Sequence, residues 1–279
     1  MPMIRATWQL SACIALTLAF TYVVCRGRSR PGVQRLSAFA KEFAVLAGVF
    51  AVYQHTVHYA RTRYVGAYHN ASALWHVERR LHLPSEVWVQ HLILPFPLLV
   101  KSLNAYYAGM HLTTMTGFMV WLWWRHRDHY PLARNTLAVT TLVCVLVQMI
   151  PVAPPRMFGD LGFVDSAIKY GQSMYGTTDG IAGQVGAMPS IHVAWAAMVA
   201  AYALKVSSNR WRWLGPGHFA MTVFVVTATA NHWWLDGVVG IAILAVAFVA
   251  MRAVTSQAPS RLVVAKPVEA EQPVGVPST

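Results

Sequence analysis

The segment Trp213–Met251 reads WLGPGHFAMTVFVVTATANHWWLDGVVGIAILAVAFVAM and is almost twice as long as one membrane-spanning helix. A bilayer core takes about 20 apolar residues per helix. We therefore expect the segment to fold back on itself at Asn231–Trp234, where two indoles suit the lipid–water boundary. The turn places His232 and Asp236 four residues apart, at one membrane face. Ionisable groups near a membrane are costly and usually functional, so this turn is a candidate site.

The composition indicates a polytopic membrane protein. Of 279 residues, 56% are hydrophobic and 11% are charged, and the mean hydropathy is +0.43. The formal net charge of +12 comes from basic residues in short loops between apolar runs. That distribution is typical of topology signals, so we expect no nucleic-acid binding. Three cysteines, Cys13, Cys25 and Cys144, are scattered in apolar runs, which favours neither a disulfide framework nor a metal knuckle.

Five further apolar runs predict membrane spans ahead of this segment: Thr7–Val24, Phe43–Tyr59, Asn104–Trp124, Arg134–Val152 and Ser190–Leu204. Basic residues follow the first run rather than precede it, which predicts a retained signal-anchor instead of a cleaved signal peptide. The folded-back segment Trp213–Met251 adds two spans. The predicted fold is therefore all-α, a polytopic integral membrane helical bundle with a six-helix core and an N-terminal signal-anchor span.

The sequence predicts three parts. Residues 1–41 form the first span and a basic cytoplasmic loop, residues 42–254 form a membrane-embedded catalytic domain, and residues 255–279 form a disordered cytoplasmic tail. Within the second part, Ala73–Leu94 mixes large apolar residues with charged ones and is broken by Pro84. This pattern is typical of helices that lie along the membrane interface.

Basic residues in the short loops predict the orientation of the chain. Residues 26–41, 125–134 and 205–212 carry most of them, which favours their side as cytoplasmic. The Gly-rich loop Ala153–Met188 and the His232 turn then face outward. We therefore predict a multi-pass protein of the cell membrane whose active site lies on the extracytoplasmic face.

Three stretches meet on that face if the spans are correct. Each contains residues that can bind a phosphate group or react with it. Arg156 can bind phosphate oxygens through two charge-assisted hydrogen bonds. Pro189 and Ser190 suit a helix start, whose free N–H groups favour an anion. His232, held by Asp236, can be a nucleophile or a base, and His192 can protonate a leaving oxygen.

Each residue also has a structural interpretation when it is taken alone. His232 and Asp236 could cap a helical hairpin, Ser190 could simply start a helix, and Arg156 could be an interfacial arginine. The order of the three stretches on one face favours catalysis. The pairs His55/His58 and His126/His129 have metal-like spacing but lack further ligands, so we expect no metal site and no cofactor.

The motifs Pro189-Ser190-x-His192 and His232-x-x-x-Asp236, set between spans, resemble the type-2 phosphatidic acid phosphatase superfamily, which shares its site with vanadium haloperoxidases. The resemblance covers roughly Ala73–Ala250. It implies that His232 forms a phosphohistidine, that Asp236 orients it, and that His192 is the general acid. It also implies that Arg156 and Ser190 hold the phosphate.

One branch of the superfamily is more similar than the rest. The forms APPR at 153–156, MPSIH at 188–192 and NHWWLD at 231–236 resemble the branch that contains fungal inositol phosphorylceramide synthase. Weaker likenesses to the same branch lie at Asn104–Tyr107, His111 and Tyr130–Arg134. The chain departs from the superfamily where cationic phosphate ligands are usual, with Met149, Val225 and Val226 in their places. Candidate substitutes are Arg63, Arg79, Arg80 and Lys169.

These patterns predict a lipid phosphatase or phosphotransferase that acts on a lipid-linked phosphate in the membrane. The superfamily resemblance favours hydrolysis, and the branch resemblance favours transfer of an inositol-phosphate headgroup to a lipid hydroxyl. A non-enzymatic alternative is a transporter or scaffold that binds a phosphate lipid without turnover. A transporter would more naturally carry broken helices and polar groups at mid-membrane.

Overall fold

The computed structural model describes residues 8–60, 65–172 and 184–257. Its long helices are α1 (Trp8–Cys25), α2 (Pro31–Ala60), α5 (Pro97–Arg125), α6 (Tyr130–Val147), α8 (Ile191–Val206), α9 (Leu214–Ala228) and α10 (Trp234–Gln257). The shorter elements are α3 (Ala67–Arg80), α4 (Glu86–Ile93), α7 (Ser166–Lys169), and the 3-10 turns η1 (Pro155–Met157), η2 (Gly159–Leu161) and η4 (Arg210–Trp213). Within the described ranges no β-strand forms, although Val152 and Gly186 pair in an isolated β-bridge.

Among the residues that the structure describes, three helices are long and apolar enough to cross a membrane by length and composition: Trp8–Cys25, Tyr130–Val147 and Trp234–Ser256. Helix α8 is apolar but shorter. Large apolar side chains on the outside of the bundle, such as those of Phe20 and Val246, are exposed, as expected of residues that face lipid. The predicted all-α membrane helical bundle is confirmed.

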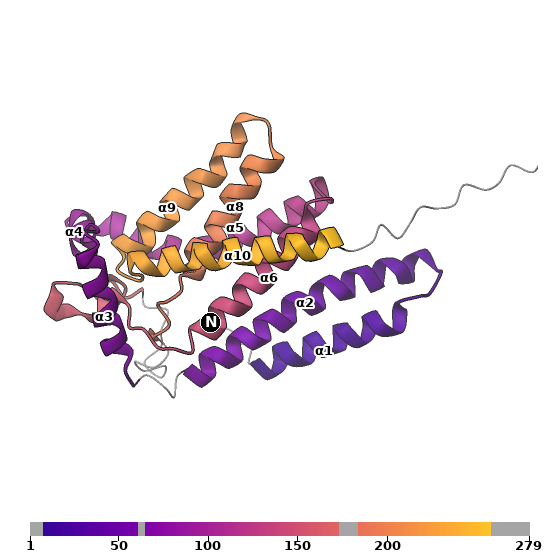
Figure 1. Ribbon diagram of the computed structural model, residues 1–279, viewed down its shortest axis with the longest axis horizontal. Coiled ribbons are helices and arrows are strands. Elements are labelled where there is room, and N and C mark those ends of the chain that lie inside the picture. The colour runs from indigo at the N-terminus through magenta and orange to yellow at the C-terminus, as the bar shows by residue number, and fades with distance from the viewer. Residues whose placement is uncertain (1–7, 61–64, 173–183, 258–279) are drawn as a thin grey trace, which may run out of the picture.

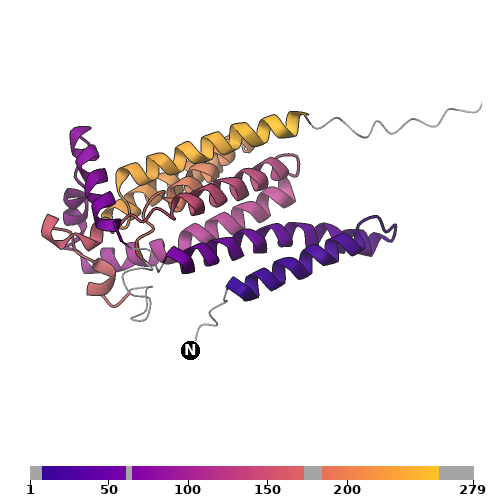
Figure 2. The ribbon, with the colours of Figure 1, turned by 60° about the horizontal axis from the view of Figure 1, so that its bottom comes forward.

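The long helices lie side by side, and α3 and α4 lie together at one end of the bundle (Figures 1 and 2). Helix α1 packs along α2, α2 packs on α6, and α10 packs on both α6 and α8. The turn between α9 and α10 reaches the same end as α3 and α4 (Figure 1). Helix α2 runs without a break across residue 41, where the sequence predicts a boundary. The predicted tail beyond Gln257 lies outside the described residues.

Proline marks where several helices begin, because its fixed φ suits the first helical turn and its missing N–H has no partner there. Pro31 is the first residue of α2, Pro97 is the first of α5, and Pro131 is the second of α6. Pro84 separates α3 from α4, as expected from the sequence. The predicted interfacial stretch Ala73–Leu94 thus contains parts of two short helices, and Leu81, directly after α3, and Trp88, in α4, are exposed.

The long apolar segment is interrupted at residues 229–233, between the end of α9 at Ala228 and the start of α10 at Trp234, which overlaps the predicted turn at Asn231–Trp234. Ala230 adopts a left-handed φ of 54° there, a conformation that costs a non-glycine residue about 1–2 kcal/mol. The predicted pair of interfacial indoles is wrong for Trp233, whose side chain is 1% exposed. Its Nε1–H donates to the carbonyl of Ala153 at 2.9 Å, so Trp233 anchors the turn to the loop after α6.

Helices α8 and α10 approach closely at their N-terminal ends. A Cβ on Gly240 would lie 2.6 Å from the carbonyl oxygen of Ser190, so only glycine fits there. The Ser190 N–H also donates to the carbonyl of Asp236 at 2.9 Å. This hydrogen bond fixes the start of α8 against the first turn of α10, close to His232.

Candidate active site

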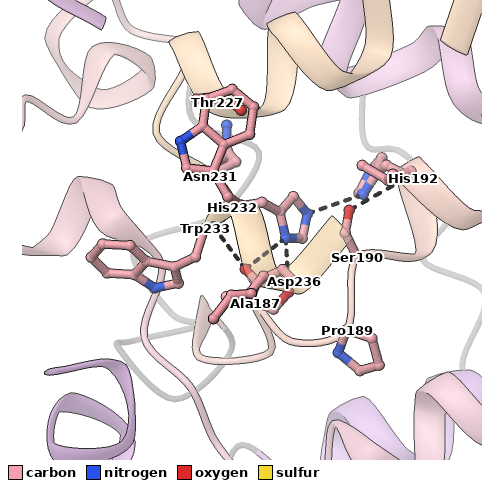
Figure 3. A network of polar contacts seen from close by, with 12 residues as sticks. Ala187, Pro189, Ser190, His192, Thr227, Asn231, His232, Trp233 and Asp236 are labelled. Atoms are coloured by element: carbon pink, nitrogen blue, oxygen red, sulfur yellow. Dashed lines mark hydrogen bonds and ion pairs between the residues drawn. The ribbon is translucent and has the colours of Figure 1, made fainter. Parts of the chain in front are cut away.

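His232 lies in the α9–α10 turn and is 4% exposed. Its Nδ1 is 2.7 Å from the carbonyl oxygen of Ala187 and 3.3 Å from Asp236 Oδ2 (Figure 3). A carbonyl oxygen can only accept a hydrogen bond, so Nδ1 carries the proton. The lone pair of the neutral imidazole is therefore on Nε2, which lies 3.3 Å from His192 Nδ1. His232 is thus held in the tautomer that a nucleophile at Nε2 requires.

Asp236 is fully buried in the first turn of α10. Its Oδ2 accepts the N–H of Trp233 at 2.9 Å as well as the more distant His232 Nδ1–H. A carboxylate at a helix N-terminus is favoured by the helix dipole. Asp236 therefore both caps α10 and faces the imidazole, and the Ala187 carbonyl is a second acceptor for the same ring proton.

Ser190 is the N-cap of α8, and its Oγ accepts the N–H of Val193 at 3.3 Å. This is the structural role that the sequence allows for it. His192 follows in the first turn and faces His232 (Figure 3). Helix α5 supplies two rings around His192: Tyr107 is stacked on it with centroids 4.6 Å apart, and His111 meets it edge-on at 4.1 Å.

Arg156 is 5% exposed and lies in η1. Its Nη1 donates to Asn231 Oδ1 at 2.8 Å, its Nη2 donates to Gln184 Oε1 at 3.1 Å, and its Nε is 3.2 Å from Asp165 Oδ2. Its backbone N–H donates to the carbonyl of Ala230 at 2.8 Å. The guanidinium is therefore fixed beside the residue that precedes His232.

The Gly-rich loop is fastened to the end of α6. The Val152 N–H donates to the carbonyl of Val185, and the Ala187 N–H donates back to the carbonyl of Val152. Pro189, which follows a cis peptide bond, lies just before α8 rather than in it, and its carbonyl accepts Gln148 Nε2–H at 3.2 Å. These bonds hold the carbonyl of Ala187 where it meets His232.

The structure thus brings together all six residues predicted for the site: His192, Ser190, Pro189, His232, Asp236 and Arg156. Contacts of His232 with His192, of Ser190 with Asp236, and of Arg156 with Asn231 join the three stretches. Within the described part of the chain, no three His, Cys, Asp or Glu side chains form a group that could hold a metal ion.

The candidate substitutes for the missing cationic ligands are placed differently. Arg79 Nη2 lies 3.2 Å from Glu86 Oε2 and is committed to a buried carboxylate. Lys169 is exposed beside the ring of Tyr170, Arg80 is exposed on α3, and Arg63 lies outside the described residues. Val225 and Val226 are buried in α9, so apolar packing occupies the positions where the superfamily usually has charge.

Sequence reasoning missed several residues around the site. Asn231, Asp165 and Gln184 bind the Arg156 guanidinium, and Glu78 and Glu86 lie against the start of α10. A signal for the last two was present, because the chain has only ten acidic residues and two of them lie in the mixed apolar and charged stretch Ala73–Leu94. Their burial could not be predicted without the packing of α3 and α4 on α10.

Comparison with protein families adds one finding: the pattern of the PAP2 superfamily matches residues 72–250, well over half of the chain. The chain belongs to this superfamily of phosphatases and phosphotransferases, and the superfamily prediction is confirmed. No curated protein and no solved structure gave a match.

Proposed function

We propose that this protein is a membrane-embedded phosphatase or phosphotransferase that acts on a lipid-linked phosphate through a phosphohistidine on His232. The observation that carries the proposal is the state of the His232 ring. Its Nδ1–H is given to Ala187 and Asp236, and its Nε2 lone pair is directed at a second histidine. Nucleophilic catalysis requires an activated nucleophile whose base and orienting group are in place.

His192 is proposed as the general acid. Because His232 Nε2 carries a lone pair, the contact at 3.3 Å requires a proton on His192 Nδ1. In-line attack requires the phosphorus and the leaving oxygen to lie between the two rings. Substrate binding therefore separates the imidazoles, and His192, in its imidazolium form beside the phosphate anion, donates a proton to the leaving oxygen and becomes neutral.

Arg156 and the N-terminus of α8 are proposed as the phosphate-binding groups. Arg156 has the charge and is held by the side chains of Asn231, Gln184 and Asp165 next to the His232 turn. The α8 N-terminus adds backbone N–H groups and a favourable dipole. Such fixed donors stabilise charge that develops on the phosphoryl oxygens.

Headgroup transfer to a lipid hydroxyl is the second candidate, favoured by the α5 residues beside His192. Tyr107 and His111 lie against the ring that would face the leaving group and, in the second half-reaction, the acceptor. They offer polar contacts to an alcohol that water does not need. This arrangement supports an inositol-phosphate transferase of the kind that the sequence motifs resemble.

We further propose that the protein is a multi-pass protein of the cell membrane and that the His232 end faces the extracytoplasmic side. The support is the concentration of basic residues in the short loops at the opposite end. Lys169→Cys, on exposed α7, should react with an impermeant maleimide in intact cells, and Ser256→Cys should not. The reverse labelling would overturn the orientation without affecting the chemistry.

The function is tested with purified protein and a panel of phosphatidic acid, polyprenyl phosphate and phosphoinositide, each with and without a lipid alcohol. Release of inorganic phosphate supports the phosphatase, and a headgroup found on the alcohol supports the transferase. Saturable binding of these lipids with no product would contradict both and favour a transporter or scaffold. The His232→Ala variant is the control for each arm.

A further inference from the structure

Two carboxyl groups that the proposed chemistry does not use are fully buried at the start of α10. Glu78 comes from α3 and Glu86 from α4, and both are 0% exposed in a chain that has ten acidic residues. Burying a carboxyl group is costly unless it is paired or hydrogen-bonded. The hydrogen bonds that the two carboxyl groups accept explain why they are buried here.

Both carboxyl groups accept backbone N–H groups of the first turn of α10. Glu78 Oε1 accepts the N–H of Leu235 at 2.8 Å, and Glu86 Oε1 accepts the N–H of Trp234 at 3.4 Å. The first N–H groups of a helix have no partner within the helix. Here two of them are satisfied from other helices, in the turn that carries Asp236 and directly follows His232.

The charges around this helix end are unbalanced. Three carboxyl groups lie there, those of Glu78, Glu86 and Asp236, and among the described residues the cations paired with them are Arg79 and, when it is protonated, His232. Arg79 Nη2 is 3.2 Å from Glu86 but 4.0 Å from Glu78 Oε2, which is beyond a hydrogen bond. Since Arg79 neutralises Glu86, the excess charge falls on Glu78.

Glu78 has the surroundings of a protonated acid. Its Oε2 is buried and, in the part of the chain that the structure describes, has no donor partner. A proton on Oε2 turns this oxygen into a donor that can bond the adjacent Glu86 carboxylate. Burial, the hydrogen bond with Glu86 and the charge of Glu86 raise the pKa of Glu78 from 4.5 to about 9.

We propose that Glu78 and Glu86 are positioning residues that share one proton and hold the first turn of α10, so that Asp236 stays ionised and aligned with His232. The inference rests on the proposed function for its catalytic consequence. If Glu78 lost its proton, three negative charges would lie at one helix end and compete for Arg79. The first turn would then loosen, and the contact between Asp236 and His232 would be lost.

The sharpest test compares two substitutions of the same residue. Glu78→Gln keeps the acceptor for Leu235 and copies the neutral acid, so turnover at pH 7 should stay within about threefold of the wild type. Glu78→Leu leaves the part-buried Leu235 N–H without its acceptor, so kcat should fall by about 10- to 100-fold with little change in KM. Asp160→Asn, on exposed η2 at the same end, is the matched control and should change neither constant.

The pH profile separates positioning from a purely structural role. A raised pKa in the folded state gives stability that is fully present below pH 4.5 and lost as pH rises through about 9. Wild-type kcat and thermal stability should therefore decline toward pH 9, whereas Glu78→Gln should lack that limb. An identical alkaline limb in Glu78→Gln, or wild-type kcat in Glu78→Leu, would overturn the proposal.

A readout independent of turnover distinguishes this inference from the proposed function. Nitrogen-15 NMR of labelled histidine, with His232 assigned from the His232→Ala spectrum, reports the Nδ1–H tautomer even in an inactive protein. Glu78→Gln should leave the His232 signals unchanged at pH 7, and Glu78→Leu should shift them. If the two variants give the same His232 signals as the wild type, the positioning role is wrong, whatever the protein catalyses.

Discussion

The α1–α2 hairpin and the end of the bundle that holds His232 use polar groups in opposite ways. A hydrogen bond from Ser11 Oγ to Gln54 Oε1 joins α1 to α2 within a largely apolar contact, and Glu42 joins α2 to α6 through Arg134 and Tyr130. The active-site end instead buries five ionisable side chains, namely those of Glu78, Glu86, Arg156, His232 and Asp236.

The difference shows which region requires exact placement of its atoms. Apolar contacts between helices in a membrane give little directional information, so a few polar links suffice to place the hairpin. The site requires atoms fixed to a fraction of an ångström, and buried hydrogen-bond networks provide that. The hairpin also lies outside residues 72–250, the part that matches the superfamily. We therefore expect substitutions at the two regions to differ in their effect on turnover.

The largest effect is expected at His232. His232→Ala should abolish turnover of every ester, because no covalent intermediate can form. His192→Ala should slow an alkyl phosphate ester by about 10²- to 10⁴-fold and an aryl ester much less, since a weakly basic leaving group needs no proton. Steady-state rates on the two esters test this, and equal losses on both would remove His192 from the acid role.

Arg156 comes next. Arg156→Lys should lose nearly as much as Arg156→Ala, about 10²- to 10³-fold in kcat, because one ammonium cannot replace a planar fork held by Asn231, Gln184 and Asp165. Turnover of both variants, alongside a thermal melt, is the measurement. Near-normal kcat in the lysine variant would show that Arg156 only braces the turn.

Asp236→Asn should lower kcat by less than the replacement of a residue that alone fixes the tautomer of a histidine. The carbonyl of Ala187 still holds the Nδ1 proton at 2.7 Å, so only the stabilisation of the charged ring is lost. We expect kcat to fall by about 10- to 100-fold in a folded protein. An activity as low as that of His232→Ala would mean that Asp236 alone controls the imidazole.

Gly240→Ala probes the approach of α8 to α10 with a single methyl group. Its Cβ would overlap the Ser190 carbonyl at 2.6 Å, so α10 must shift, with a loss of about 1–3 kcal/mol in stability. Turnover should fall about tenfold, because Asp236 lies one turn away on the same helix. Gly117→Ala on α5, where a Cβ meets nothing within 4 Å, is the matched control.

The smallest effect on turnover is expected in the hairpin region. Glu42→Gln removes the ion pair with Arg134 and should lower the free energy of unfolding by about 1–3 kcal/mol. Turnover should stay within about twofold of the wild type, since the pair lies outside the site network. A large loss of kcat with unchanged stability would erase the distinction between the two regions.

Much of the helix bundle could be predicted from the sequence because apolar runs determine spans in a membrane. The turn at Asn231–Trp234 and the three converging stretches followed from length and motif order alone. The environment of Trp233 did not follow, because whether an indole faces lipid or protein depends on neighbours distant in the chain. Here the loop after α6 covers it, through the carbonyl of Ala153.

In the candidate site, too, the sequence indicates the residue types but not the contacts made by residues that are distant in the chain. The types of residue at 156, 192, 232 and 236 indicate phosphate chemistry, and the structure brings them together. The groups that hold them include the Ala187 carbonyl and the side chains of Gln184 and Asp165, while Glu78 of α3 and Glu86 of α4 hold the first turn of α10, and none of these lies in a motif. The Ala187 carbonyl is the clearest case, because every residue has a carbonyl and only the fold decides which one meets His232.

The central claim, a covalent phosphohistidine on His232, is tested most directly by rapid quenching of the enzyme with a phosphorus-32-labelled lipid phosphate. We predict an acid-labile, base-stable label on the wild-type protein that maps to the peptide containing residue 232. We expect the same label on Arg156→Lys at a lower level and none on His232→Ala. Label of equal intensity on His232→Ala would contradict the claim and place the nucleophile elsewhere.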